Sequence, residues 1–257
     1  MKHAALATLF AAVASIACAE GEHVPPDPPQ THVHEMPYGE MVEMMGMDDR
    51  ARFGKVMLDR LEWRDADEST YEWDAAAWYG GDFNKVWLAT EGEQVDGSVT
   101  DARVEVLWDR ILTAWWSTRV GAREDFGDGP TRDWFAFGVA GLAPGFFELE
   151  AMAFVGENGR TALRLSGDYD LLITQRLVLQ PEAEVNIYGS ADPERHIGSG
   201  LSDLEVGLRL RYEIRREFAP YLGVSWSKRF GDSADLAEAA GDDSDEVAWV
   251  VGIRAWF

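Results

Sequence analysis

The sequence is almost free of cysteine, since Cys18 is the only one in 257 residues. It lies at the end of an N-terminal segment with a lysine near its start, an apolar stretch and a small-x-small site at Ala17-Cys18-Ala19. This is the pattern of a secretory signal peptide, so we expect residues 1–19 to be removed. A lipoprotein carrying lipid on Cys18 is the alternative, although Ser15-Ile16 fits that signal poorly. The mature chain would have no thiol, which excludes disulfides and thiolate metal ligands.

Long hydrophobic runs and positive charge are also scarce. After residue 20 no apolar run approaches the ~20 residues of a membrane-spanning helix. There are 23 Lys and Arg side chains against 46 Asp and Glu, a formal net charge of -23. Nucleic acid is therefore not an expected partner, because phosphate binding needs clustered positive charge. Cations are the natural ligands of such a surface.

Residues 20–52 form a region without apolar periodicity. PPDPPQ (25–30) is a stiff, extended linker, and HVHEMPYGEMVEMMGMDD (32–49) follows it. Five of the chain's eight methionines lie within residues 36–47, and two of its five histidines lie just before them. With almost no core-forming side chains, this region is predicted to be a disordered arm.

The arm combines thioether with imidazole groups. Thioether is a soft ligand that selects monovalent copper, whereas imidazole also suits divalent copper. The histidines are spaced i, i+2 and three of the methionines i, i+3, i+4, so a flexible chain could fold around one ion. The alternative is a solvated linker that is merely rich in methionine. The predicted copper ligands are His32, His34, Met36, Met41, Met44, Met45 and Met47.

From residue 53 onward, short alternating segments recur between Gly, Pro, Asp and Asn residues. In EVAWVVGIRAWF (246–257), Trp and Val alternate with Gly and Arg. A soluble sandwich also alternates, but here the polar faces carry Arg with Glu or Asp at the strand centres. Such a pattern is typical of a lipid-facing band around a charged, hydrated lumen, and only a closed barrel leaves no unpaired strand edge in lipid. We predict an all-β fold, a transmembrane antiparallel β-barrel over residues 53–257.

Twelve strands are predicted, with ten as the alternative because the first segment is irregular: Asp59 falls on the same side as Met57 and Leu61. An even number places both ends of the barrel on the periplasmic side. The longer connections (64–69, 125–131, 189–202, 230–245) would then lie outside and the tight ones inside. The predicted strands are 53–63, 70–79, 84–92, 99–109, 113–124, 132–141, 145–155, 160–171, 176–188, 203–213, 218–229 and 246–257.

Carboxylates on the polar strand faces are the candidates for a cation path. One interpretation is a network of ion pairs that plugs the barrel, and the other is a passage with a net negative wall. The acidic connection 231–246 could concentrate cations at the outer mouth or simply keep the surface solvated. The candidate lumen residues are Glu72, Asp74, Glu91, Glu105, Glu148, Glu150, Asp168, Glu182, Glu184, Glu205 and Glu213.

Two other functions are alternatives. Outer-membrane phospholipases are barrels with a paired Ser and His. Here His196 is the sole histidine of the barrel part, and Ser199 lies near it without an obvious orienting residue. The second alternative is a general small cation-selective porin.

Several stretches resemble the copper resistance protein B family of outer-membrane proteins. They include WYGGDFNKVWLATEGE (78–93), GLAPGFFELEAMAFVGENG (141–159), HIGSGLSDLEVGLRLRYEIRREFAPYLGV (196–224) and VVGIRAWF (250–257). The resemblance implies a non-enzymatic outer-membrane barrel in copper tolerance, with copper as its ion (Cu⁺, Cu²⁺ or both).

The resemblance also implies a Met- and His-rich arm in the periplasm and a periplasmic multicopper oxidase as a partner. The terminal aromatic Phe257 resembles the signal that the outer-membrane assembly machinery recognises. Outer-membrane lipid would surround the barrel.

Overall fold

The structure is a computed structural model that describes residues 38–45, 51–65, 69–241 and 243–257. The chain divides into two units, residues 1–49 and 50–257. In the first unit the structure describes one helix, α2 (Tyr38–Met45), within the region predicted to be disordered. Its Glu and Met residues favour helix, although eight residues make a marginal helix in isolation. No helix in the described part of the chain is long and apolar enough to cross a membrane.

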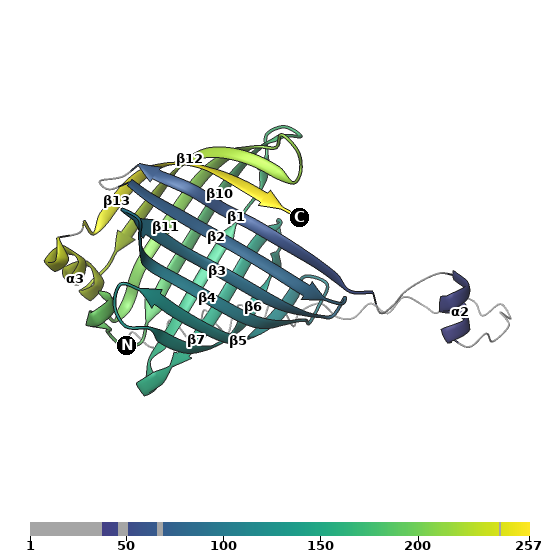
Figure 1. The fold of residues 1–257 in the computed structure, drawn as a ribbon, viewed down its shortest axis with the longest axis horizontal. Helices are drawn as coiled ribbons and strands as arrows, with labels where there is room; N and C mark the ends of the chain where they lie inside the picture. The colour runs from purple at the N-terminus through teal and green to yellow at the C-terminus, as the bar shows by residue number, and fades with distance from the viewer. Residues whose placement is uncertain (1–37, 46–50, 66–68, 242) are drawn as a thin grey trace. The chain divides into compact units, whose positions relative to one another are not determined.

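The second unit is a closed antiparallel barrel (Figure 1). Sequential strands pair along the chain, and β1 pairs with β13 to close the sheet. The two-residue β9 pairs with β10 beyond β8, so β8 and β9 share one of twelve strand positions. The strands are β1 (Phe53–Asp65), β2 (Ser69–Gly80), β3 (Asn84–Val95), β4 (Ser98–Ile111), β5 (Trp116–Gly127), β6 (Arg132–Ala143), β7 (Phe147–Gly156), β8 (Thr161–Asp168), β9 (Leu171–Leu172), β10 (Leu177–Tyr188), β11 (Gly200–Tyr212), β12 (Phe218–Arg229) and β13 (Asp245–Trp256).

Alternation along each strand separates an apolar outer face from a polar interior. On β13, Trp249 is 66% exposed, whereas the next residue, Val250, is 1% exposed. The same alternation on β11 leaves Leu208 exposed and buries Arg209. Successive strand side chains point to opposite faces, so the apolar set faces outward around the barrel. The predicted transmembrane barrel of twelve strands is confirmed.

Several predicted strand boundaries shift by up to three residues, and two of the differences have a clear structural cause. The segment predicted as 113–124 begins at Trp116, because Thr113 belongs to the preceding turn and its hydroxyl accepts hydrogen bonds from the backbone N–H groups of Trp115 and Trp116. The strand predicted as 160–171 is interrupted between β8 and β9. This gap lies opposite Pro181 of β10, whose nitrogen has no hydrogen to donate to the ladder.

A bulge in β1 explains why its pattern was irregular in the sequence. Arg60 pairs with Asp74 and Leu58 with Ala75, so Asp59 is an extra residue in β1. A bulge sets two residues against one on the partner strand and turns neighbouring side chains to the same side. Asp59 and Arg60 therefore both face the interior, and the inward set continues with alternating residues after them.

The barrel has two different rims. The terminal rim, where β1 begins and β13 ends, carries the turns 81–83, 112–115, 144–146, 169–176 and 213–217. The loop rim carries the turns 96–97, 128–131 and 157–160 and two longer connections. One of these holds the short helix η2 (Pro193–Arg195) and the other holds α3 (Asp232–Ala240). In Figure 1 the C-terminus and α3 lie at opposite ends of the barrel.

Replacing Gly121 of β5 with alanine should disrupt the pairing of β4 with β5. A Cβ atom there would lie 1.9 Å from the carbonyl oxygen of Val106, a backbone atom that cannot swing aside. We expect a loss of roughly 1–3 kcal/mol, as for other overpacked sites. Urea-induced unfolding of the refolded barrel measures it. Gly81→Ala is the control, because its Cβ would meet nothing closer than 3.8 Å; equal stability of the two variants would contradict this account.

Candidate functional site

Ion pairs between arginine and carboxylate cross the lumen. Arg60 of β1 lies 3.1 Å from Glu72 on the adjacent strand and 3.4 Å from Glu182 on β10. Arg64 lies 2.6 Å from Glu205 on β11. Because β1 does not pair with β10 or β11, these contacts bridge the interior and do not merely follow the wall.

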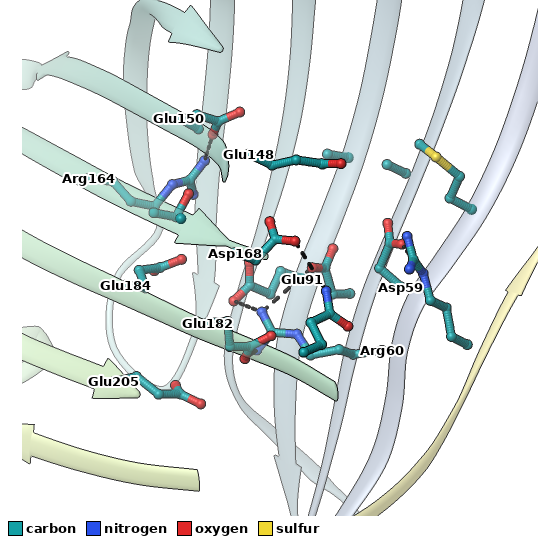
Figure 2. A pocket seen from close by; sticks show the side chains of 18 of the residues that line it. Asp59, Arg60, Glu91, Glu148, Glu150, Arg164, Asp168, Glu182, Glu184 and Glu205 are labelled. Atoms are coloured by element: carbon teal, nitrogen blue, oxygen red, sulfur yellow. Dashed lines mark hydrogen bonds and ion pairs between the residues drawn. The ribbon is translucent and has the colours of Figure 1, made fainter. Parts of the chain in front are cut away.

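A second set of pairs bridges the other half of the circumference. Arg103 of β4 lies 3.6 Å from Glu184 of β10, and Arg164 of β8 lies 3.0 Å from Glu105 of β4. Arg164 also donates a hydrogen bond to Glu150 of β7 at 3.2 Å. Figure 2 shows Glu150 and Glu184 pointing into one shared space, which Glu105 also lines. Each of these four arginines thus forms ion pairs with carboxylates from at least two strands.

The most buried of these carboxylates is Glu62 of β1, which is 1% exposed. It accepts hydrogen bonds from Arg209 at 2.8 and 2.9 Å and from the Tyr221 hydroxyl at 2.9 Å. A buried carboxylate persists as an ion only when it is paired and hydrogen-bonded. The sequence pattern did not indicate Glu62 as an interior residue, because the bulge at Asp59 interrupts the inward alternation of β1.

The interior space is lined by this network and extends towards the terminal rim. A cavity of about 370 Å³ has Arg60, Glu91 and Asp168 among its lining residues. A second cavity of about 480 Å³ shares Glu148 and Asp168 with it and is also lined by the 112–115 turn. The two cavities together are therefore accessible from the terminal rim.

All but two of the predicted lumen carboxylates line the cavity of about 370 Å³. Glu72 lies beside it, paired with Arg60 and Arg64. Glu213 follows the end of β11 and does not line this cavity; its side chain lies 3.0 Å from Arg216 in the turn and 4.0 Å from the buried Arg211.

Glu148 and Asp168 are register partners on β7 and β8. Glu148 has no cationic partner in the described part of the chain, and Asp168 accepts only a hydrogen bond from the neutral Gln180 at 3.2 Å. Carboxylates directly opposite each other repel. The cavity wall near the terminal rim thus carries uncompensated negative charge.

Part of the lumen is apolar, which the sequence analysis did not expect. The cluster comprises Leu107, Trp134, Ala136, Met152 and Phe154, none more than 6% exposed. These side chains come from the inward faces of β4, β6 and β7, where their cross-strand neighbours are other inward residues. The interior is consequently not hydrated throughout. Charged residues were the only signal used for the lumen, so this cluster was missed.

The connection between β10 and β11 crosses the loop rim as a strap, which we define as residues 189–199. Asp192 accepts hydrogen bonds from Arg132 of β6 at 2.7 and 3.1 Å. Arg195 donates to Asp101 of β4 at 2.7 Å. Since β4 and β10 are five positions apart around the barrel, the strap spans the mouth.

The strap also packs against α3. The backbone N–H of Gly198 donates to the Ser233 hydroxyl at 2.8 Å, and Ser202 and Ser233 share a hydrogen bond of 2.8 Å. A Cβ at Gly198 would lie 2.3 Å from the Ser233 nitrogen, so only glycine permits this approach. The acidic connection predicted as a loop over 231–246 therefore contains a helix that helps to cover the loop rim.

Three of the predicted copper ligands lie on α2. Met41, Met44 and Met45 are exposed, and their i, i+3, i+4 spacing places them on one face of the helix. His32, His34, Met36 and Met47 lie outside the described residues. No group of three or more His, Cys, Asp or Glu side chains in the described chain is placed to hold a metal ion.

The residues of the alternative hydrolase do not form a dyad. The hydroxyl of Ser199 donates to Asp232 at 3.2 Å. His196 is exposed at the end of η2 with φ 55°, and the described chain contains no hydrogen bond between the two. In this geometry the His196 imidazole does not accept a hydrogen bond from the Ser199 hydroxyl, as activation of a serine nucleophile would require.

Replacing Arg209 with methionine should strongly destabilise the barrel. The change leaves Glu62 buried without its main partner, and breaking a buried pair this way costs about 3–5 kcal/mol. Urea unfolding followed by tryptophan fluorescence measures the effect, and Lys228→Met, which breaks an exposed pair with Asp245, should cost less than about 1 kcal/mol. If Arg209→Met were as mild as Lys228→Met, the lumen pairs would not be structural.

Replacing Asp192 with asparagine should loosen the strap. The Arg132 hydrogen bonds hold the pKa of Asp192 below its usual value. The stabilisation is therefore complete above the unfolded pKa of about 3.9 and is lost as the pH falls through the lower folded pKa. At neutral pH, where the stabilisation is complete in wild type, we expect Asp192→Asn to speed trypsin cleavage after Arg195 in the folded barrel.

Glu194→Gln is the matched control for the strap. Glu194 also lies 2.8 Å from Arg132, but its side chain is 72% exposed, and exposed pairs contribute little. Cleavage of Asp192→Asn no faster than that of Glu194→Gln would show that the buried carboxylate does not hold the strap.

Comparison with known proteins shows which family this barrel is similar to. The family model described as "Copper resistance protein B precursor (CopB)" matches residues 52–257. The chain is 46% identical over 203 residues to "Copper resistance protein B" of Escherichia coli, covering 79% of this chain and 69% of that protein. It is 46% identical over 210 residues to "Copper resistance protein B homolog" of Pseudomonas syringae pv. tomato (strain ATCC BAA-871 / DC3000), covering 81% and 71%.

Solved structures share the fold. The KdgM porin superposes with a TM-score of 0.51 at 13% identity, and the NanC porin with 0.53 at 15% identity. Each comparison covers 79% of this chain and 99% of the porin. At these identities the likeness concerns the barrel architecture alone.

Proposed function

Since the chain belongs to the copper resistance protein B family, we propose that this outer-membrane barrel collects copper from the periplasm and either holds it in its acidic lumen or passes it on. The observation that carries the proposal is the cavity that opens at the terminal rim and is lined with carboxylates in excess of their cations. Cations are the ions that such a wall favours.

The terminal rim would face the periplasm. Both ends of the sheet lie at this rim, as expected for a barrel with an even number of strands. The arm precedes β1, so the arm would join the barrel on the periplasmic side. The strap and α3 would then lie at the outer surface.

The arm would supply the first copper ligands. Met41, Met44 and Met45 on one helical face offer three thioethers to Cu⁺, which soft ligands prefer. His32 and His34 add imidazoles that also accept Cu²⁺. Met36 and Met47 flank the helix in sequence and would complete either site.

The lumen would receive the ion after the arm. The acidic candidates on the wall form the cation path, with Glu148 and Asp168 nearest to the terminal rim free of arginine partners among the described residues. Deeper in, arginine pairs and the apolar cluster obstruct the path. This obstruction favours holding copper over an open general porin, and passage would require the pairs and the strap to rearrange.

No catalysis is needed in this role. The Ser199 hydroxyl donates to Asp232 and not to His196, which supports a non-enzymatic barrel. A periplasmic multicopper oxidase would be the partner that handles the redox state of the metal. Insertion would depend on the outer-membrane assembly machinery through the last strand and Phe257.

Copper titration of the mature protein with and without residues 20–50 tests the arm. We expect the full chain to bind more copper than the truncated barrel. Met41→Leu/Met44→Leu/Met45→Leu should lose Cu⁺ and keep Cu²⁺, and His32→Ala/His34→Ala should show the reverse preference. Equal copper uptake by full and truncated chains would refute the arm's role.

Flux across vesicles separates holding from passage. Purified barrel in vesicles that trap a copper chelator should transmit little copper while the strap is closed, and Asp192→Asn should increase transmission. The control is Glu194→Gln. Rapid flux through the wild type would show that the lumen pairs do not obstruct the ion.

A further inference from the structure

The cationic side chains of the described chain fall into two groups. Most are paired with carboxylates, as Arg60 in the lumen, Arg195 at the loop rim and Arg216 at the terminal rim illustrate. Six others have no carboxylate partner among the described residues. They are Arg52, Lys55, Lys85, Arg110, Arg176 and Arg215.

All six of these unpaired cations lie at the terminal rim. Arg52 precedes β1 and Lys55 follows its first residues; Lys85 opens β3 and Arg110 closes β4. Arg176 precedes β10, and Arg215 lies in the turn between β11 and β12. In a chain with twice as many acidic as basic residues, unpaired guanidinium groups gathered at one end point to an anion from outside the barrel.

The same rim carries exposed apolar side chains, one or more on every turn. They are between 52% and 69% exposed. The set is Phe83, Leu112, Trp115, Phe146, Ile173 and Ile214. Side chains of this kind beside cations match the boundary between hydrocarbon and headgroups, where aromatic residues and basic groups anchor membrane proteins.

We propose that the terminal rim binds anionic phospholipid headgroups of the surrounding leaflet through Arg52, Arg110, Arg176 and Arg215. All four side chains are exposed. Guanidinium holds phosphate oxygens bidentately. With the terminal rim facing the periplasm, the lipid belongs to the periplasmic leaflet. The lipid proposal rests on that part of the proposed function and does not depend on copper binding.

The distribution of the charges favours lipid over a single protein partner. Arg52 precedes β1, Arg110 lies in β4, Arg176 precedes β10 and Arg215 lies in the β11–β12 turn. The last two lie on neighbouring turns, so the four arginines occupy three separate parts of the circumference. Only a partner that surrounds the barrel can contact all of them. The acidic arm also carries anions, but its sequence has few aromatic or branched apolar residues to contact the exposed turn tips.

The two lysines are arranged differently. Lys55 lies 4.6 Å from the centre of the Trp256 ring, and Lys85 lies 4.7 Å from that of Trp78. These cation–π contacts satisfy the ammonium groups in part. The lysines are therefore left unchanged in the test.

The test measures lipid selectivity. The mature barrel is placed in nanodiscs of phosphatidylcholine with phosphatidylglycerol, and native mass spectrometry counts the lipids that it retains. We expect retained phosphatidylglycerol to be enriched about tenfold or more at low salt, since each cation near an anionic surface contributes appreciably. The enrichment should fall towards onefold in Arg52→Gln/Arg110→Gln/Arg176→Gln/Arg215→Gln.

Arg216→Gln/Lys228→Gln is the control, because both residues are exposed but paired, with Glu213 and Asp245; it should keep the enrichment. A gel-mobility shift on heating verifies folding of each variant. If the quadruple variant does not fold, Arg110→Gln/Arg215→Gln and a salt series on wild type replace it, with enrichment expected to fall in both.

Several results would overturn the proposal. One is a wild type without enrichment, and another is enrichment that survives in the variants or at high salt. Enrichment seen only after deletion of residues 20–49 would mean that the acidic arm, and not lipid, occupies the rim in the full chain. Copper binding is not measured here, so failure of this proposal is distinguishable from failure of the copper role.

Discussion

Several arginines in the lumen lie where carboxylates from different strands would otherwise repel one another. Arg60 draws together side chains from β2 and β10, and Arg209 holds the buried Glu62. Breaking such a pair leaves a buried charge uncompensated, so the strands that carry the charges are fixed relative to each other. The lumen pairs therefore support the closed wall and set the shape of the space that remains inside it.

That space is asymmetric along the barrel axis. It opens at the terminal rim, where Glu148 and Asp168 have no cationic partner among the described residues, and the strap crosses the opposite mouth. The same asymmetry appears outside, where unpaired cations and exposed apolar turn tips gather at the terminal rim. Both features fit a barrel whose two ends meet different surroundings.

The sequence predicted the barrel well because lipid and lumen impose a strict alternation on every strand. Most candidate lumen carboxylates were found for the same reason. The prediction failed where the alternation is interrupted, or where the residue type does not reveal which face is the interior. The bulge at Asp59 concealed Glu62, and Pro181 split one strand in two. Met152 and Phe154 were overlooked because apolar residues that face the lumen look like those that face lipid.

The sequence by itself predicted twelve strands, with ten as the alternative, together with the outward apolar band and the charged interior, and it carries the thioether and imidazole groups of the arm. These follow from local periodicity and composition, which need no knowledge of distant contacts. Only the tertiary structure decided which arginine meets which carboxylate, that Arg195 reaches Asp101 across the mouth, and which cations stay unpaired. Those outcomes depend on the curvature and register of a closed sheet, which bring together residues far apart in the chain.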